Sequence, residues 1–206
     1  MTPLEQRKHF HSVCERAYLP VDTKLPTGES FHVFGGNMVV FRQELDDVVN
    51  IAFQGSKTLP DWLQNFYAWP TKKVQHIGKF HRGYACKVIE HLQEIDTLLS
   101  TGKQNIVGGH SAGGGEGGIF AAVSYRQELI TQVVTFGAPQ YIRKIYSAHH
   151  ENWLRQSTTH YVNPYDMVTW VPPGMQRIGK EVFKGIRVQG GSEHPLPLYA
   201  EFFKDV

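Results

Sequence analysis

Three side chains of this sequence could carry out covalent hydrolysis: one serine, one aspartate and one histidine. Residues 109–113 read GHSAG and match G-x-S-x-G, the pattern of a sharp turn that presents a nucleophilic serine, here Ser111. A serine hydroxyl is a poor nucleophile near neutral pH unless a base accepts its proton and an acid orients that base. Asp166 and His194 follow along the chain and supply these two residue types. Together the three predict attack on an ester carbonyl, although Asp166 could also be a turn residue and His194 a surface residue.

A second motif overlaps the first and predicts a different chemistry. Residues 113–118 read GGGEGG and match G-x-G-x-x-G, a loop that holds the pyrophosphate of a dinucleotide. In that fold the first glycine directly follows a strand, and an acidic residue about 20 positions later binds the ribose. Here Gly113 lies six residues beyond Val107, inside an expected helix, and residues 129–150 contain no Asp or Glu. A nucleotide-binding protein is therefore the weaker interpretation, and a flexible glycine-rich loop is a third.

The elements that must position these residues alternate between helices and strands. Helical spacing of apolar residues occurs in 4–18, 81–100, 112–126 and 140–156, and β-like runs are 31–34, 38–41, 48–55, 104–109, 131–137 and 158–163. The tail predicts a hairpin around 184–185 and a short terminal helix, and residues 57–79 predict irregular structure. Strands separated by helices imply crossover connections and a parallel sheet covered on both faces. We expect one α/β domain over residues 1–206, with a central, mostly parallel sheet flanked by helices.

Polar residues follow three of the expected strands. Ser56, Ser111 and Asp166 each come at or just after the end of a different strand. In open α/β sheets, ligands bind at the carboxyl ends of the strands. We therefore expect these residues to meet, with His194 from the tail joining them, although Ser56 could be an ordinary turn serine because Gly-Ser is a common turn pair.

Composition argues against several other functions. The net charge is +2 and Lys and Arg are scattered along the sequence, so no nucleic-acid partner is expected. His149, His150 and His160 lack the spacing or the cysteine partners of zinc sites, so we expect no metal, and no organic cofactor is implied. The two cysteines, Cys14 and Cys86, could pair in principle, but they are too few for a disulfide scaffold, and we expect free thiols.

The first twenty residues, MTPLEQRKHFHSVCERAYLP, are polar and lack the apolar segment of a Sec signal peptide. No apolar run approaches the roughly 20 residues that cross a membrane. The expectation is a cytoplasmic location or delivery by a non-Sec route.

Several segments, spread over residues 47–203, resemble the class 3 lipases, a family typified by the fungal triacylglycerol lipases. In chain order the similar segments are VVNIAFQGSKTLPDWLQNF, HRGY, GGHSAGG, VVTFGAPQ, NPYDMVTWVPP and EHPLPLY. The resemblance implies the α/β-hydrolase fold of the class 3 lipase type. It also implies a serine carboxylester hydrolase acting on a lipid ester, as a lipase or phospholipase. A non-catalytic lipid-binding module of the same fold is the alternative.

Carried over residue by residue, the resemblance implies Ser111 as nucleophile, Asp166 as orienting acid and His194 as general base. It implies an oxyanion hole formed by Ser56 and the backbone N–H of Ala112. The sequence departs from the family pattern where Ala112 replaces a leucine and where glycines after residue 113 replace Ala and Leu. His110, beside the nucleophile, is expected to be structural and to point away from the site.

Residues 57–70, KTLPDWLQNFYAWP, occupy the position of the family's flap over the nucleophile. The resemblance makes Trp62, Phe66, Tyr67 and Trp69 the candidate substrate or flap residues, with the protein core as the other interpretation, above all for Trp62. Aromatic side chains of this kind lie at water–lipid boundaries. The expected partner is therefore a lipid or ester substrate, with contact to a membrane or lipid aggregate.

Overall fold

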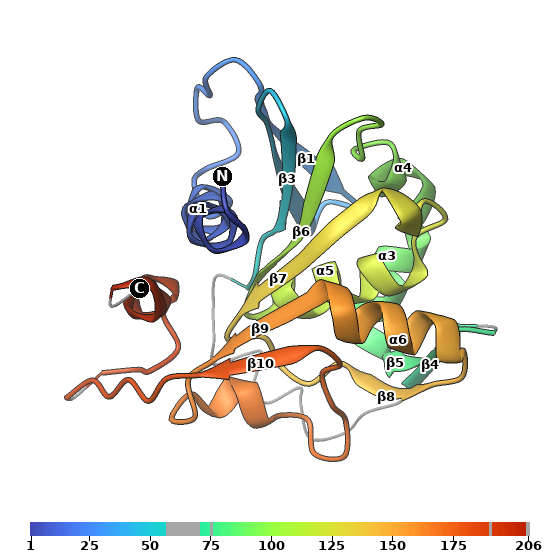
Figure 1. Cartoon of the computed structure of the whole chain (residues 1–206), viewed down its shortest axis with the longest axis vertical. Helices are drawn as coiled ribbons and strands as arrows, with labels where there is room; N and C mark the ends of the chain where they lie inside the picture. Colours follow the sequence, from blue (N-terminus) through green and yellow to red (C-terminus); the bar gives the residue numbers. More distant parts are fainter. Residues whose placement is uncertain (57–70, 75, 190, 205–206) are drawn as a thin grey trace.

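The structure, a computed structural model, describes residues 1–56, 71–74, 76–189 and 191–204. A seven-stranded sheet runs through the centre of the molecule in the order β1-β2-β3-β6-β7-β9-β10 (Figure 1). Its strands are β1 (Glu29–Phe34), β2 (Met38–Glu44), β3 (Val48–Phe53), β6 (Gln104–His110), β7 (Ile130–Phe136), β9 (Thr158–Val162) and β10 (Lys180–Phe183). The pairs β3–β6, β6–β7, β7–β9 and β9–β10 are parallel, whereas β2 is antiparallel to both β1 and β3. The predicted mostly parallel α/β sheet is confirmed.

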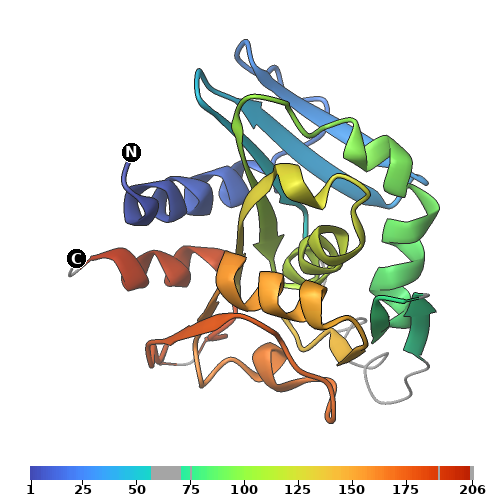
Figure 2. The same cartoon turned by 45° about the vertical axis from the view of Figure 1, so that its right-hand side comes forward.

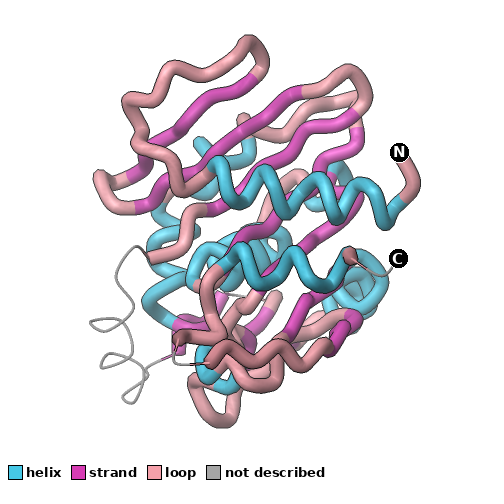
Figure 3. The backbone as a smooth tube through the Cα atoms, turned by 90° about the vertical axis from the view of Figure 1, so that its left-hand side faces the viewer, coloured by secondary structure: helices cyan, strands magenta, loops and turns pink. Residues whose placement is uncertain are grey.

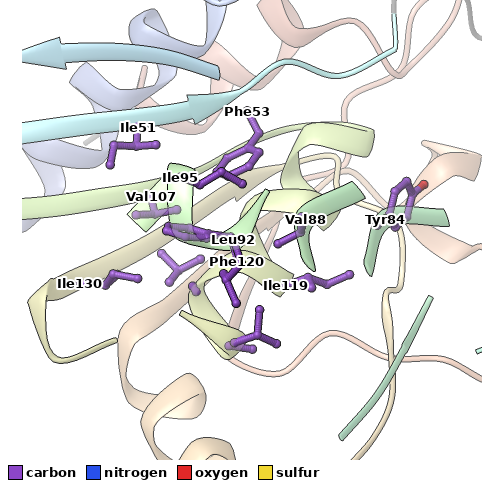
Figure 4. Close-up of a cluster of buried hydrophobic side chains, with 14 of the residues drawn as sticks. Ile51, Phe53, Tyr84, Val88, Leu92, Ile95, Val107, Ile119, Phe120 and Ile130 are labelled. Atoms are coloured by element: carbon purple, nitrogen blue, oxygen red, sulfur yellow. The ribbon is translucent and has the colours of Figure 1, made fainter. Parts of the chain in front are cut away.

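Helices cover both faces of this sheet, as the uninterrupted burial of β3 requires. On one face lie α3 (Arg82–Glu90), α5 (Ala112–Val123) and α6 (Ala148–Ser157), and on the other lie α1 (Pro3–Arg16) and the 3₁₀ helix η4 (Leu196–Phe203) (Figures 1 and 2). Each face has its own apolar core. Figure 4 shows the first, in which Ile51 and Phe53 of β3 face Phe120 of α5 and Leu92.

The second core joins the two ends of the sequence. Helix α1 begins with a capping box, in which the Thr2 hydroxyl accepts the Glu5 N–H and the Glu5 carboxylate accepts the Thr2 N–H. Phe10 and Val13 of α1 pack in the same cluster as Phe203 of η4. The two helices therefore lie side by side, close to both termini (Figure 3).

A second sheet, which the sequence did not predict, has the order β4-β5-β8, with β4 (Thr71–Val74), β5 (Gly78–His81) and β8 (Ile142–Ile145). The prediction of irregular structure up to residue 79 is therefore wrong for β4 and β5. The prediction of a helix over 140–156 is wrong in its first part, where β8 pairs with the distant β5. Phe80 and Ile142 of this sheet are fully buried in the first core, so a long-range contact overrides the local helical pattern.

Two further predictions need correction. The helix predicted over 81–100 ends at His91, whose backbone is not helical, and continues as α4 (Leu92–Asp96). The hairpin predicted around 184–185 is absent, because β10 pairs in parallel with β9. Over the described residues, no helix is long and apolar enough to cross a membrane.

Candidate active site

Ser111 stands on the sharp turn between β6 and α5. Its φ of 57° is left-handed, a conformation that a non-glycine residue adopts only where the surrounding structure enforces it. Its N–H donates to the Phe136 carbonyl of β7 at 3.0 Å. A Cβ on Gly109 or Gly113 would collide with the Phe53 carbonyl of β3, so only glycine fits on either side of the serine. The predicted strand–turn–helix context of the motif is confirmed.

The glycine run is explained by close packing of α5 against the sheet. Every residue of α5 is buried. A Cβ on Gly117 would lie 2.8 Å from the Gly108 Cα of β6, and one on Gly114 would lie 2.7 Å from the Ala138 Cβ. The G-x-G-x-x-G match therefore lies inside a buried helix, where it presents no loop to a pyrophosphate.

His194 and Asp166 form a buried pair. The His194 Nδ1 and the Asp166 Oδ2 are 2.6 Å apart, and both side chains are almost fully buried. The same Oδ2 accepts the Tyr199 hydroxyl at 2.7 Å, and the Oδ1 accepts the Val168 N–H at 2.9 Å. Because a carboxylate only accepts, Nδ1 carries the imidazole proton. The Nε2 of His194 is then left as a lone-pair acceptor.

Two polar atoms of the site have no partner among the described residues: the Ser111 Oγ and the His194 Nε2. Both are buried, and an unpaired buried polar atom costs about 1–3 kcal/mol unless a function retains it. One is a hydroxyl donor and the other an acceptor. His110, next to Ser111 in the sequence, packs its ring against that of His194 with centroids 4.7 Å apart, so the two residues that carry these atoms lie in the same region.

His110 does not point away from the site, contrary to the prediction. Its Nε2 lies 2.9 Å from the His194 carbonyl oxygen and its Nδ1 lies 2.9 Å from the Tyr18 hydroxyl. Burial holds the pKa of His110 well below its usual value, so the ring is neutral at pH 7. A neutral ring donates from Nε2 to the carbonyl and accepts at Nδ1 from Tyr18. His110 therefore connects the end of α1 to the backbone of His194.

The first two residues after β3, Gln54 and Gly55, bring the chain against Ser111. A Cβ on Gly55 would lie 3.1 Å from the Ser111 Cβ and 2.6 Å from the His110 carbonyl oxygen. Ser56, which follows, lines a cavity of about 520 Å³ together with His110 and His194. The structure thus places Ser56 and His194, far apart in sequence, on the walls of one cavity.

Ala112 is the first residue of α5 and is buried. The first N–H groups of a helix have no acceptor within the helix and carry a partial positive charge. The N–H of Ala112, which follows Ser111 directly, is one of these groups.

Two contributors were missed by sequence reasoning, Tyr199 and Tyr18. Each contacts the site through a single hydroxyl, and no local motif marks either of them. Trp62, Phe66, Tyr67 and Trp69, the candidate flap residues, lie outside the described residues. Within the part of the chain that is described, no group of three or more His, Cys, Asp or Glu side chains could hold a metal ion.

Comparison with known proteins identifies the family and agrees with the fold. The family described as Lipase (class 3) matches residues 50–175. Among solved structures, a Rhizomucor miehei lipase in a propeptide complex is 17% identical with a TM-score of 0.70, over 89% of this chain and 67% of the other. Lipase II from Rhizopus niveus is 16% identical with a TM-score of 0.69, and the match covers 87% of this chain and 80% of the other. A mono- and diacylglycerol lipase from Aspergillus oryzae is 16% identical with a TM-score of 0.72, and the match covers 91% of this chain and 81% of the other. No curated protein matches the sequence.

Proposed function

Because this chain belongs to the class 3 lipase family and is a carboxylic ester hydrolase acting on lipid esters, we propose that Ser111 is its nucleophile, His194 its general base and Asp166 the orienting acid. The observation that supports the proposal is the buried His194–Asp166 pair, which leaves His194 Nε2 as an acceptor; that atom and the Ser111 Oγ are both buried and without a partner among the described residues. The pair fixes the one tautomer of His194 that accepts a proton at Nε2.

The reaction proceeds in two halves. The Ser111 Oγ attacks the acyl carbonyl as His194 Nε2 takes its proton, and the negative Asp166 stabilises the imidazolium that forms. The tetrahedral intermediate collapses, the C–O bond to the alcohol breaks, and His194 returns the proton to the departing alcohol. Water then attacks the acyl-enzyme, with His194 again as base, and the fatty acid leaves.

The charge on the carbonyl oxygen requires fixed donors. The N–H of Ala112 at the start of α5 and Ser56 at the end of the β3 segment supply them in this proposal. Loss of one such donor costs about 2.7–4 kcal/mol of transition-state stabilisation in comparable sites. The second donor is assigned to Ser56 because it lines the same cavity as His194.

The cavity is the proposed position of the substrate. Its volume of about 520 Å³ falls within the range of ligand pockets, and its walls include Leu196, Pro195 and Pro197 beside His194. An apolar wall next to the base suits the hydrocarbon part of a lipid ester.

Ser111→Ala tests the proposal. The variant should lose hydrolysis of a soluble short-chain ester by at least about 10³-fold, down to the background of the oxyanion hole, because no nucleophile remains. A fluorophosphonate probe, which forms a covalent bond only with an activated serine, should label the wild type at Ser111, as mass spectrometry of the peptides would report.

Ser192→Ala is the matched control, since Ser192 lines the same cavity and contacts His194 only through the backbone N–H. It should keep the probe label at Ser111. Labelling of Ser56 instead, or a Ser111→Ala protein with normal turnover, would assign the chemistry to another residue.

A further inference from the structure

The second sheet gathers cationic side chains that are scattered along the sequence. Its three strands read TKKV, GKFH and IRKI and contain no Asp or Glu. Five cationic residues on them are exposed: Lys72, Lys73, Lys79, Arg143 and Lys144. The whole chain has a net charge of only +2, so the rest of the molecule is net negative. We call this group the cationic sheet.

Three of the lysines form a row across the sheet. Lys73 of β4 is the register partner of Lys79 in β5, and Lys79 is the partner of Lys144 in β8. Directly paired residues of neighbouring strands point to the same side, and like charges at such positions are destabilising. The opposite side of the sheet packs Phe80 and Ile145 into the first core. The three lysines of this row therefore lie on the solvent face of the sheet, where their positive charges repel one another.

No acidic partner relieves this repulsion. Within the described part of the chain, none of the five cations forms an ion pair with Asp or Glu. Arg143 donates to the Gly174 carbonyl, which leaves its charge uncompensated. Among the described residues, the other partner of these cations is a ring: the Nζ atoms of Lys73 and Lys144 lie 6.0 and 5.8 Å from the centroid of Tyr146, which is 39% exposed.

The cationic sheet lies at the active-site end of the main sheet. Strand β7 ends at Phe136, whose carbonyl accepts the Ser111 N–H. The chain then enters β8 within a few residues. The Ile142 N–H donates to the Gln176 carbonyl at 3.0 Å and the reverse bond is 2.8 Å, so β8 is joined to the segment that follows Asp166. On that segment Met167 and Trp170 are 71% and 48% exposed. Figure 1 shows β4, β5 and β8 below α3 and α6, away from α1.

We propose that the cationic sheet binds the anionic surface of a phospholipid bilayer and so holds the active-site end of the enzyme against its lipid. Unpaired lysines attract anionic head groups, and exposed Tyr146 and Trp170 suit the boundary between head groups and acyl chains. The choice of a bilayer over other polyanions rests on the lipid ester as substrate and on these exposed aromatic residues. The surface is separate from the triad, so its test does not depend on which residue is the nucleophile.

The experiment measures sedimentation with vesicles, using the Ser111→Ala protein so that hydrolysis cannot change the lipid. Binding to vesicles that mix phosphatidylcholine with phosphatidylglycerol should exceed binding to phosphatidylcholine alone. The triple variant Lys73→Gln, Lys79→Gln, Lys144→Gln should lower the partition coefficient about a hundredfold, since each cation near the surface contributes about a factor of five. High salt, about 1 M, should remove the difference between the two lipids.

The matched control removes the same charge elsewhere, with Lys8→Gln, Lys180→Gln and Lys204→Gln, all of which are exposed. It should retain most of the binding. A third protein with arginine at the three positions of the lysine row should bind as the parent does, which separates loss of charge from loss of folding. Hydrolysis of a soluble ester, measured in the otherwise wild-type background, reports the active site independently.

Three results would overturn the proposal. The first is equal binding to phosphatidylcholine with and without phosphatidylglycerol. The second is an equal loss of binding in the two glutamine triples. The third is tight binding of duplex DNA without binding of anionic vesicles, which would identify the surface as one for nucleic acid.

Discussion

Ser111, the proposed nucleophile, and its two proposed partners are held in place by different interactions. Ser111 is fixed by packing: α5 is buried along its whole length, and glycines let its backbone approach β3 and β6 more closely than any side chain would allow. Asp166 and His194 lie on segments with little regular structure and are fixed by hydrogen bonds from Tyr199, Val168 and each other. The position of Ser111 therefore depends on glycines that lack a side chain, whereas the positions of Asp166 and His194 depend on side chains that form hydrogen bonds.

This difference predicts what substitutions should do in each of the two parts of the site, the Ser111 turn and the Asp166–His194 pair. The interior around Ser111 is close-packed, so a larger side chain there would collide with its neighbours. Such substitutions should therefore lower the free energy of unfolding before they affect catalysis. Removed atoms near His194 leave the backbone in place, so substitutions there should damage catalysis while the protein stays folded. The predictions below test this division, beginning with the largest expected effect.

Asp166→Asn should lower kcat on the order of 10⁴-fold with little change in the melting temperature, by analogy with the same change in a serine protease. The amide keeps the shape of the carboxylate. It cannot stabilise an imidazolium, and an amide N–H at the Oδ2 position would make His194 accept at Nδ1 and carry its proton on Nε2. Ester hydrolysis and thermal unfolding on the same samples check both parts. A fully active variant would mean that another acid orients His194, and Glu193 would be the next residue to change.

Gly117→Ala should lower the free energy of unfolding by about 1–3 kcal/mol, because its Cβ would meet the Gly108 backbone of β6, which cannot move aside. Gly115→Ala, in the same helix, is the control. Its Cβ would meet only side-chain atoms, with the Tyr84 ring at 3.2 Å, and alanine gains up to about 1 kcal/mol of helix propensity. Urea denaturation of both variants gives the comparison. Equal stability of the two would show that the glycine run has a purpose other than packing.

Tyr199→Phe should lower kcat about tenfold and leave the melting temperature within a few degrees of the wild type. The change removes one of the two donors to Asp166 Oδ2, a hydrogen bond to a charged acceptor of about 1.5–3 kcal/mol, while His194 still occupies that oxygen. Tyr141→Phe is the control, because the Tyr141 hydroxyl is buried without a partner among the described residues. It should keep full activity. If Tyr199→Phe instead unfolds the protein with kcat unchanged, its hydroxyl stabilises the fold and not the position of the acid.

The Ser111 turn and the surroundings of the Asp166–His194 pair also differed in how well the sequence predicted them. The turn at Ser111 is a local motif, and the buried strands around it carry strong periodicity, so the elbow and the parallel sheet were predicted correctly. The helix after the elbow was predicted as well, but its burial and the close approach of Gly117 to β6 were not, since that contact appears only when both elements are placed. The Ser111, Asp166 and His194 assignments came from ordered motifs and remain a proposal that mutagenesis must test.

The rest could not be predicted because it depends on contacts between distant residues. Residues 142–145 read IRKI, which fits a helical pattern locally, and only the pairing with β5 makes them a strand. The Tyr18–His110 and Tyr199–Asp166 contacts each join residues that no motif connects. The cationic sheet is of the same kind, since its lysines lie on two stretches of chain separated by more than sixty residues.

The link from Tyr18 through His110 to His194 has a consequence for protein synthesis. A ribosome releases the chain from its first residues onward, and chains begin to fold as they emerge. Ser111 therefore reaches the solvent while His194, η4 and the contact that holds them to α1 have yet to be made. In the proposed mechanism the nascent polypeptide therefore carries Ser111 without its base, and hydrolytic activity begins only when the segment of His194 and η4 docks against α1.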